Sequence, residues 1–429
     1  MFHQKIFRLL LLGCLILPLW VTFPPDVSAK KEIGCYDRSI PVTPEEQRIS
    51  DGKPIPQQIL KESRFDRFTD RFERDLCSAS SPEAATKLVE KHGSRLWKTA
   101  VQRAQGKRPD MGDLDRYDDR PLYWARLNMA RNLRQWHPDF QLSNKQREHI
   151  LKRLEYTSRG LPTVDFPRGK AAKRILVSGF DPYRLEQEFR RSNPSGASAL
   201  QMDGLHIQTK EGPAIIQTVM FPVRWRDFEG GIVEDAFGPS LKPGPRQIDL
   251  MMTISQGRPR QMDIEGFAGR WHTGTDNELA SRSVEIPPAP QWPMPDPLPE
   301  FIETTLPYQQ MIDANTGPWP VSRNDTVCEW LPPDHSGPYV CRDEGPTPGS
   351  KAREGGGGSY LSNESQYRSN RLRLGLGADH LPGGHLHIAA LEKYPRDPAI
   401  YLDDDFQQER RATVDQTVEL VKAAARAVD

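Results

Sequence analysis

Residues 174–180, Arg-Ile-Leu-Val-Ser-Gly-Phe, form a short apolar run that ends just before Asp181-Pro182. Comparable runs bounded by glycine and proline lie at 214–223, 248–255 and 384–391. Their length and β-branched content are typical of buried strands. Helical segments are expected between them, near 195–202 and 300–312, and a last helix near 413–428. This alternation predicts an α/β domain with a twisted, mostly parallel sheet across residues 170–429.

The preceding part of the chain, residues 30–165, has helical patterns instead. Ser81 stands before Pro82 as an N-cap followed by a first-turn proline, and Ser143 with Gln146 forms a capping box. Aromatic residues at helical spacing here are expected to form core. We therefore predict a helical extension before the α/β domain, and we regard its surface as a candidate docking site for a protein partner.

The amino terminus has the order of a secretory signal peptide. Basic residues precede an apolar run from Leu9 to Val21, and Val27-Ser28-Ala29 supplies small residues for cleavage. We expect residues 1–29 to be removed and the protein to be secreted or otherwise extracytoplasmic. A lipid-acceptor role for Cys14 and an uncleaved membrane anchor are the alternatives. Both are disfavoured, because the apolar run continues past Cys14 and is shorter than the ~20 residues that span a bilayer.

Charge and length set broad limits. The 429-residue chain has 58 basic and 58 acidic residues and a formal net charge of zero. This balance gives no electrostatic argument for binding nucleic acid or an anionic membrane. The length leaves room for two or three domains with at least one sizeable core.

A glycine-rich turn contains the segment Gly357-Gly358-Ser359-Tyr360-Leu361-Ser362-Asn363-Glu364. Such a turn can present a side chain while its backbone N–H groups point at a developing oxyanion. The segment resembles the nucleophile turn of the type I pyroglutamyl peptidases (pyrrolidone-carboxylate peptidases), cysteine exopeptidases that remove an amino-terminal pyroglutamate. Ser362 stands where that family has its catalytic cysteine.

Other segments resemble the same family in the family's own order. They are Ile175–Tyr183 with Asn193-Pro194-Ser195, then Gly257-Arg258 leading to Ile264-Glu265 and Asp276-Asn277, then Thr305-Leu306-Pro307, and last Gly384–Ile388. The resemblance covers roughly residues 170–429 and implies a three-layer α/β/α sandwich. Residues 319–356, rich in Pro, Gly and Asp, fit none of these motifs and are expected to be an inserted loop.

The resemblance also implies a catalytic set. Amide hydrolysis through a covalent intermediate needs a nucleophile, a base and a group that orients the base. Ser362, His387 and Glu265 match those three roles.

A substrate pocket follows from the same likeness. Phe180, Tyr183, Tyr360 and Leu361 match the positions that surround the lactam ring, whose flat apolar faces suit such a slot. The partners implied are peptides with a blocked, pyroglutamyl amino terminus.

A metal site is the competing interpretation of the histidines. Asp379, His380, His385 and His387 lie close in sequence, and two histidines on one strand face are a known ligand geometry. No Cys or Glu completes a familiar spacing. We expect neither a metal nor a cofactor.

The cysteines favour disulfides. Apart from Cys14 they are Cys35, Cys77, Cys328 and Cys341, an even number in a chain expected to be exported. Three pairings are open. Cys35–Cys77 with Cys328–Cys341 is favoured, because each pair brackets one segment outside the family-like motifs.

Two functions from different classes remain. The first is an exported pyroglutamyl-peptidase-like hydrolase that uses Ser362. The second is a catalytically silent member that binds peptides or a protein, since serine is far less acidic than cysteine. A further departure is that the family's arginine before Asp276-Asn277 is replaced here by Thr273-Gly274-Thr275, with Arg270 the nearest alternative.

Overall fold

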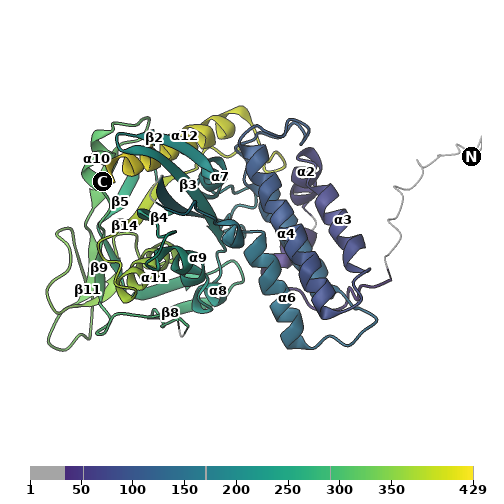
Figure 1. Ribbon diagram of the computed structural model, residues 1–429, viewed down its shortest axis with the longest axis horizontal. Coiled ribbons are helices and arrows are strands. Elements are labelled where there is room, and N and C mark those ends of the chain that lie inside the picture. The colour runs from purple at the N-terminus through teal and green to yellow at the C-terminus, as the bar shows by residue number, and fades with distance from the viewer. Residues whose placement is uncertain (1–33, 52, 170–171, 290, 429) are drawn as a thin grey trace, which may run out of the picture. The chain divides into compact units, whose positions relative to one another are not determined.

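The computed structural model describes residues 34–51, 53–169, 172–289 and 291–428, so the predicted signal peptide lies outside the described residues. The described residues from Cys35 onward form one compact unit (Figure 1). Within the described part, no helix is both long enough and apolar enough to cross a membrane.

A seven-stranded sheet with the order β10-β5-β14-β4-β1-β3-β2 forms the centre of the α/β part. Its strands are β1 (Lys173–Phe180), β2 (Leu205–Thr209), β3 (Gly212–Phe221), β4 (Leu250–Pro259), β5 (Met262–Glu265), β10 (Val321–Asn324) and β14 (Gly383–Ala390). The pairs β1–β3, β1–β4, β4–β14 and β5–β10 are parallel, whereas β5–β14 and β2–β3 are antiparallel. The prediction of a mostly parallel sheet is confirmed.

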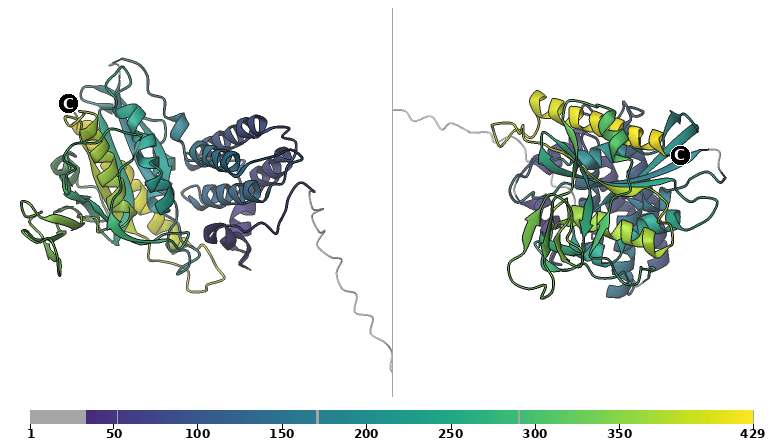
Figure 2. Two further views of the ribbon diagram at one scale, coloured as in Figure 1. Left: turned by 90° about the horizontal axis from the view of Figure 1, so that it is seen from below. Right: turned by 90° about the vertical axis from the view of Figure 1, so that its left-hand side faces the viewer.

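Helices cover both faces of the sheet (Figure 2). One side has α7 (Pro194–Met202), α10 (Tyr308–Asp313) and α12 (Asp404–Ala427), and the other has α8 (Trp225–Glu229), α9 (Ile232–Leu241) and α11 (Leu361–Gly375). Successive strand residues point to opposite faces. Accordingly Val177 packs in the core with Leu420 of α12, and Leu176 packs in the core with Leu372 of α11. The predicted three-layer arrangement is confirmed.

The amino-terminal region is helical, as predicted. Its helices are α1 (Pro44–Gln47), α2 (Ile55–Glu62), α3 (Asp66–Leu76), α4 (Pro82–Ala104), α5 (Arg120–Gln135) and α6 (Asn144–Thr157). The Ser81 hydroxyl accepts from the Ala84 N–H, and Ser143 and Gln146 form a reciprocal capping box. A core that includes Trp97, Trp124 and Trp136 joins these helices.

Two sequence predictions differ from the structure. The sequence predicts a helix near 300–312, but residues 300–306 contain β9 (Phe301–Glu303) and a turn, and the helix begins only after Pro307. A proline inside a helix would remove a hydrogen bond and clash with the preceding turn. Residues 319–356 are not simply a loop, since they contain β10, β11 (Val327–Trp330), β12 (Val340–Arg342) and β13 (Lys351–Glu354).

Three short strands complete the described fold: β6 (Phe267–Gly269), which pairs with β9, and the hairpin of β7 (Trp271–Thr275) and β8 (Ser281–Glu285).

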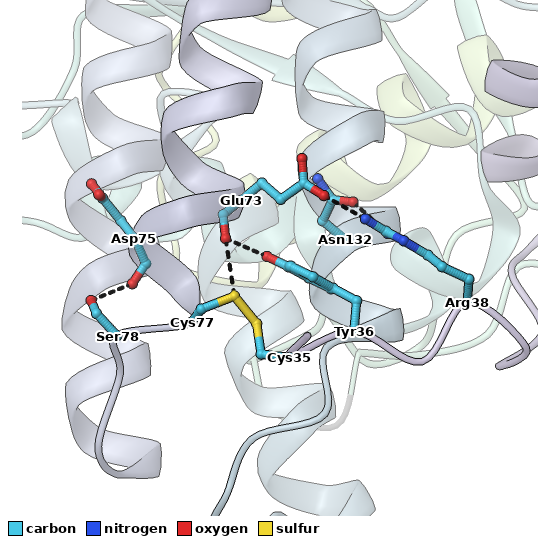
Figure 3. The surroundings of a disulfide bond; sticks show 8 residues. All are labelled: Cys35, Tyr36, Arg38, Glu73, Asp75, Cys77, Ser78 and Asn132. Carbon is cyan, nitrogen blue, oxygen red and sulfur yellow. Dashed lines mark hydrogen bonds and ion pairs between the residues drawn. A yellow bond between two sulfur atoms is a disulfide. The ribbon is translucent and has the colours of Figure 1, made fainter. Parts of the chain in front are cut away.

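Both favoured disulfides are present. Cys35–Cys77 joins the segment before α1 to the end of α3, and Cys328–Cys341 joins β11 to β12. Figure 3 shows the first of these, where the Tyr36 hydroxyl donates to the Glu73 carbonyl oxygen at 2.6 Å and Arg38 pairs with the Glu73 carboxylate at 2.5 Å. The covalent link and these bonds hold the start of the described chain against α3.

Candidate active site

A buried imidazole–carboxylate pair lies between two neighbouring strands. β14 and β5 run antiparallel, and the His387 Nδ1 lies 2.6 Å from the Glu265 Oε1. The other Glu265 oxygen accepts from the side-chain amide of Asn324 at 2.9 Å. Asn324 is on β10, directly opposite Glu265 of β5. A carboxylate on Nδ1 fixes the tautomer, so Nε2 is left as the proton acceptor. Among the described residues, none is hydrogen-bonded to Nε2.

The glycine-rich turn packs directly against this pair. A Cβ on Gly356 would lie 2.4 Å from the Glu265 Oε2, and one on Gly357 would lie 2.7 Å from the His387 Cε1. On the other side, a Cβ on Gly257 would lie 2.8 Å from the His387 Cβ. Glycine is therefore required at these places by the close approach of backbone to side chain.

Ser362 is in the first turn of α11. The N-cap residue of this helix, Tyr360, makes no side-chain capping bond. First-turn N–H groups have no acceptor within the helix and carry the positive end of the helix dipole. Ser362 and His387 line one cavity together with Glu265 and Gly355–Gly358. In this conformation the Ser362 hydroxyl donates to the Gly357 carbonyl oxygen at 3.3 Å and not to the imidazole. The three predicted catalytic residues thus surround one cavity, with the hydroxyl turned toward the backbone.

A smaller, mainly apolar pocket adjoins this cavity. It is lined by the four residues predicted to hold the ring, Phe180, Tyr183, Tyr360 and Leu361, together with Asn193, Val223, Ser255, Gln256 and Ser362. The rings of Tyr183 and Tyr360 lie 6.5 Å apart, and the Tyr360 hydroxyl donates to the Thr275 carbonyl oxygen at 2.9 Å. That bond fixes the Tyr360 ring as one wall of the pocket.

Gln256 is a pocket residue that the sequence prediction missed. It is 7% exposed, lines both cavities and has a buried Nε2 without a hydrogen-bond partner in the described part of the chain. Buried polar groups are almost always paired, so an unpaired amide facing a cavity is suited to a ligand oxygen. The available signal was its position near the carboxyl end of a central parallel strand, where α/β folds place ligands.

His385 has a structural role beside the pair. Its Nδ1 lies 2.7 Å from the Thr253 hydroxyl and its Nε2 lies 2.9 Å from the Ser255 hydroxyl. Burial, and then the nearby His387, hold its pKa well below the usual range. Both nitrogens of this neutral ring are therefore occupied. Among the described residues no three His, Cys, Asp or Glu side chains are grouped as a metal site would need.

The arginines near the site do not match the pattern of the pyroglutamyl peptidases that the sequence resembles. Arg270, the nearest alternative in sequence, pairs with Glu300 at 2.5 Å and with Glu285 at 3.1 Å. The arginines that line the cavity shared by Ser362 and His387 are Arg184, which lies over the Tyr183 ring, and Arg258. Arg270 is therefore engaged with two carboxylates and is not among the residues that line this cavity.

Comparison with known proteins gives two kinds of match. The sequence matches the PA0049 N-terminal domain over residues 27–155 and the PA0049 C-terminal domain over residues 174–289 and 319–392. It is 31% identical to the uncharacterized protein PA0049 of Pseudomonas aeruginosa, over 86% of this chain and 84% of that one. The crystal structure of pyroglutamyl peptidase I from Bacillus amyloliquefaciens is weakly similar, with a TM-score of 0.38 and 18% identity, over 60% of this chain and 95% of that chain.

Proposed function

The chain belongs to the PA0049 family, and on that premise we propose that its α/β part is an exported hydrolase that removes or recognises amino-terminal pyroglutamate, with Ser362 in place of the usual cysteine. One observation carries the proposal. The buried His387–Glu265 pair and Ser362 lie around one cavity, and Ser362 also lines the adjoining apolar pocket. A nucleophile, an oriented base and a binding slot are the parts that this chemistry needs.

In the proposed reaction the Ser362 hydroxyl turns from the Gly357 carbonyl to the His387 Nε2 and attacks the amide carbon. The imidazole takes the hydroxyl proton and Glu265 stabilises the resulting imidazolium. First-turn N–H groups of α11 stabilise the oxyanion. The leaving amine then takes the proton from the imidazole as the C–N bond breaks, and water hydrolyses the acyl ester. Gln256 would donate its free N–H to a carbonyl oxygen of the substrate.

The second candidate is a catalytically silent, pyroglutamyl-peptidase-like protein that binds a ligand without cleaving it. It is favoured by the Ser362 hydroxyl bond to Gly357 and by the engagement of Arg270 with two glutamates. A serine beside an imidazole does not ionise as a cysteine does, so a site built for a thiolate loses most of its rate with serine. In that case the ring pocket would bind a blocked peptide terminus without cleaving it.

A fluorogenic pyroglutamyl amide assay separates the two candidates. We expect slow or no turnover by the wild type and a gain in Ser362→Cys. We expect that gain to be lost in Ser362→Cys with His387→Ala, because the imidazole base is then absent. The assay uses mild reductant that spares the structural disulfides. Absence of a gain in a folded Ser362→Cys protein would favour the binding role. Robust wild-type turnover that Ser362→Ala abolishes would instead identify a working serine enzyme.

Export is part of the same proposal. Two disulfides suit an oxidising compartment. Mass spectrometry of the secreted protein is expected to find an amino terminus near Lys30 and no thiol that reacts with an alkylating reagent. Four reactive thiols in the mature protein would contradict it.

A further inference from the structure

We propose that the helical region is a fixed internal brace of the ring pocket, in which Glu45, Asp119 and Arg126 position the pocket loop, residues 181–193, from outside the α/β part. The identification of the pocket rests on the proposed function. The brace itself can be measured without any activity.

The first contact is at the start of the loop. Asp181 follows Phe180 directly and is 1% exposed. Its carboxylate accepts two hydrogen bonds from Arg126 of α5, at 2.8 and 2.7 Å, and one from Arg159, at 2.6 Å. Separating the partners of such a buried pair leaves an uncompensated charge, so moving the loop away from the helices has a high free-energy cost.

The second contact is at the end of the loop. Asp119, the residue before α5, accepts from the Ser192 hydroxyl and from the Asn193 N–H, the latter at 3.0 Å. Asn193 lines the ring pocket, and its side-chain amide donates to the Asp181 carbonyl oxygen at 2.8 Å. Asp119 therefore holds a pocket residue directly, and Asn193 joins the two ends of the loop.

The third contact reaches the loop through one intermediate. Glu45 of α1 accepts from the Asn277 side-chain amide at 3.0 Å, and the same amide donates to the Pro182 carbonyl oxygen at 2.9 Å. Glu45 is itself held by the Tyr123 hydroxyl at 3.0 Å. This chain of bonds ends one residue before Tyr183, a wall of the pocket.

Three separate contacts thus converge on a segment that would otherwise be a surface loop. Loops are usually the most mobile part of a fold, and ordering one on binding costs affinity. A loop that is already fixed lets the ring bind a preformed slot. The buried side chains that do this are engaged within the chain and are not open to an external partner.

Two brace variants are matched with a control. Asp119→Asn keeps the shape of the side chain but gives up one acceptor. Glu45→Ala removes the link to Asn277 and leaves Arg224 paired with Glu155 and Asp227. The control, Glu90→Ala, breaks a partly exposed ion pair with Arg153 inside the same helical region.

Hydrogen–deuterium exchange and ligand binding provide the readouts. In both brace variants we expect exchange within residues 181–193 to rise about tenfold over wild type and over Glu90→Ala, while β1 and β4 stay unchanged. Thermal midpoints should stay within about 4 °C of wild type. Affinity for L-pyroglutamamide, measured by calorimetry, should fall about fivefold because the slot is no longer preformed.

The outcomes are distinct. Equal exchange within 181–193 in all proteins would overturn the brace. So would a uniform increase across the sheet, which indicates a general loss of stability. If exchange rises only in the loop and wild type does not bind L-pyroglutamamide, the brace stands and the proposed function fails.

Discussion

The His387–Glu265 pair leaves no room for a side chain at Gly356 or Gly357. The Gly356 backbone also accepts a bond from Asn324, the residue that holds the second Glu265 oxygen, at 2.7 Å. One short segment therefore sets the position of both the carboxylate and its neighbour. Small displacements at such a site have large effects on rate, since about 1 Å can cost about 100-fold.

Gly356→Ala tests this dependence. The new methyl would lie 2.4 Å from the Glu265 Oε2, so the carboxylate must move away from the imidazole. We expect pyroglutamyl amidase activity, measured in the Ser362→Cys background, to fall by about 10- to 100-fold. Gly317→Ala, where nothing lies within 4 Å of the added carbon, is the control and should keep its rate. Equal rates in the two variants would show that the turn does not position the pair.

The pH dependence of stability has a residue-scale source at Asp119. Burial, and then the neighbouring Asp118, raise the pKa of Asp119 to about 7, whereas an unfolded aspartate has a pKa of about 3.9. The folded state therefore binds more protons between about pH 4 and 7. The contribution of Asp119 to the free energy of unfolding is full below this window and is lost as pH rises to about 7.

Asp119→Asn should remove that loss. As the pH rises from 5 to 8, the wild-type free energy of unfolding should fall by about 2 kcal/mol more than that of the variant. Urea unfolding at the two pH values measures this difference. Burial also raises the pKa of Glu278 to about 7, but Glu278 is present in both proteins and cancels in the comparison. A pH-independent difference between the two proteins would contradict the assignment.

At the scale of elements, long apolar runs were predictable and short or long-range features were not. The runs at 174–180, 214–223, 248–255 and 384–391 became β1, β3, β4 and β14. β5 and β10 are four residues each, too short for a periodic signal, although they carry Glu265 and Asn324. The predicted helix at 300–312 is present only from Tyr308 onward, because a helix cannot easily continue through Pro307.

The same distinction applies to the site. Ser362, His387 and Glu265 were proposed from local motifs with a fixed order. The free amide of Gln256, the pairing of Arg270 with Glu285 and the contact of Arg126 with Asp181 depend on three-dimensional proximity. No spacing in the sequence encodes them.

The two disulfides should differ in what their loss costs. Cys35–Cys77 closes a loop of 42 residues and Cys328–Cys341 one of 13. Loop entropy in the unfolded chain predicts losses of about 4 and about 3 kcal/mol respectively. Urea unfolding of the Cys35→Ser/Cys77→Ser and Cys328→Ser/Cys341→Ser proteins measures both. A larger loss for the shorter loop would mean that native-state contacts, not loop closure, dominate.

At the scale of the whole molecule, the helical and α/β parts share buried charges. Arg224 is 3% exposed and pairs with Glu45 at 3.3 Å, with Glu155 at 2.9 Å and with Asp227 at 2.7 Å. Two of these three partners are in the helical region. Each part alone would carry charges that its own residues do not neutralise.

A protein reduced to residues 166–429 should therefore fail to fold. It would lack Arg126, Arg159 and Glu45 as partners of Asp181 and Arg224, and unpaired buried charges cost about 3–5 kcal/mol each. We expect no cooperative thermal transition by circular dichroism and aggregation in size-exclusion chromatography. A monomer that unfolds cooperatively near the full-length midpoint would show that the two parts are independent.

Arg410 of α12 pairs with Asp115 at 3.0 Å and with Asp118 at 2.9 Å, and the Tyr117 hydroxyl donates to Asp415 at 2.8 Å. A ribosome makes about 5–20 residues per second, so Asp118 is synthesised roughly 15–60 seconds before Arg410. Asp115 and Asp118, next to α5, therefore spend most of translation without their ion-pair partner Arg410. Under the proposed export, this late pairing means that the complete fold can form only after most of the chain has been synthesised.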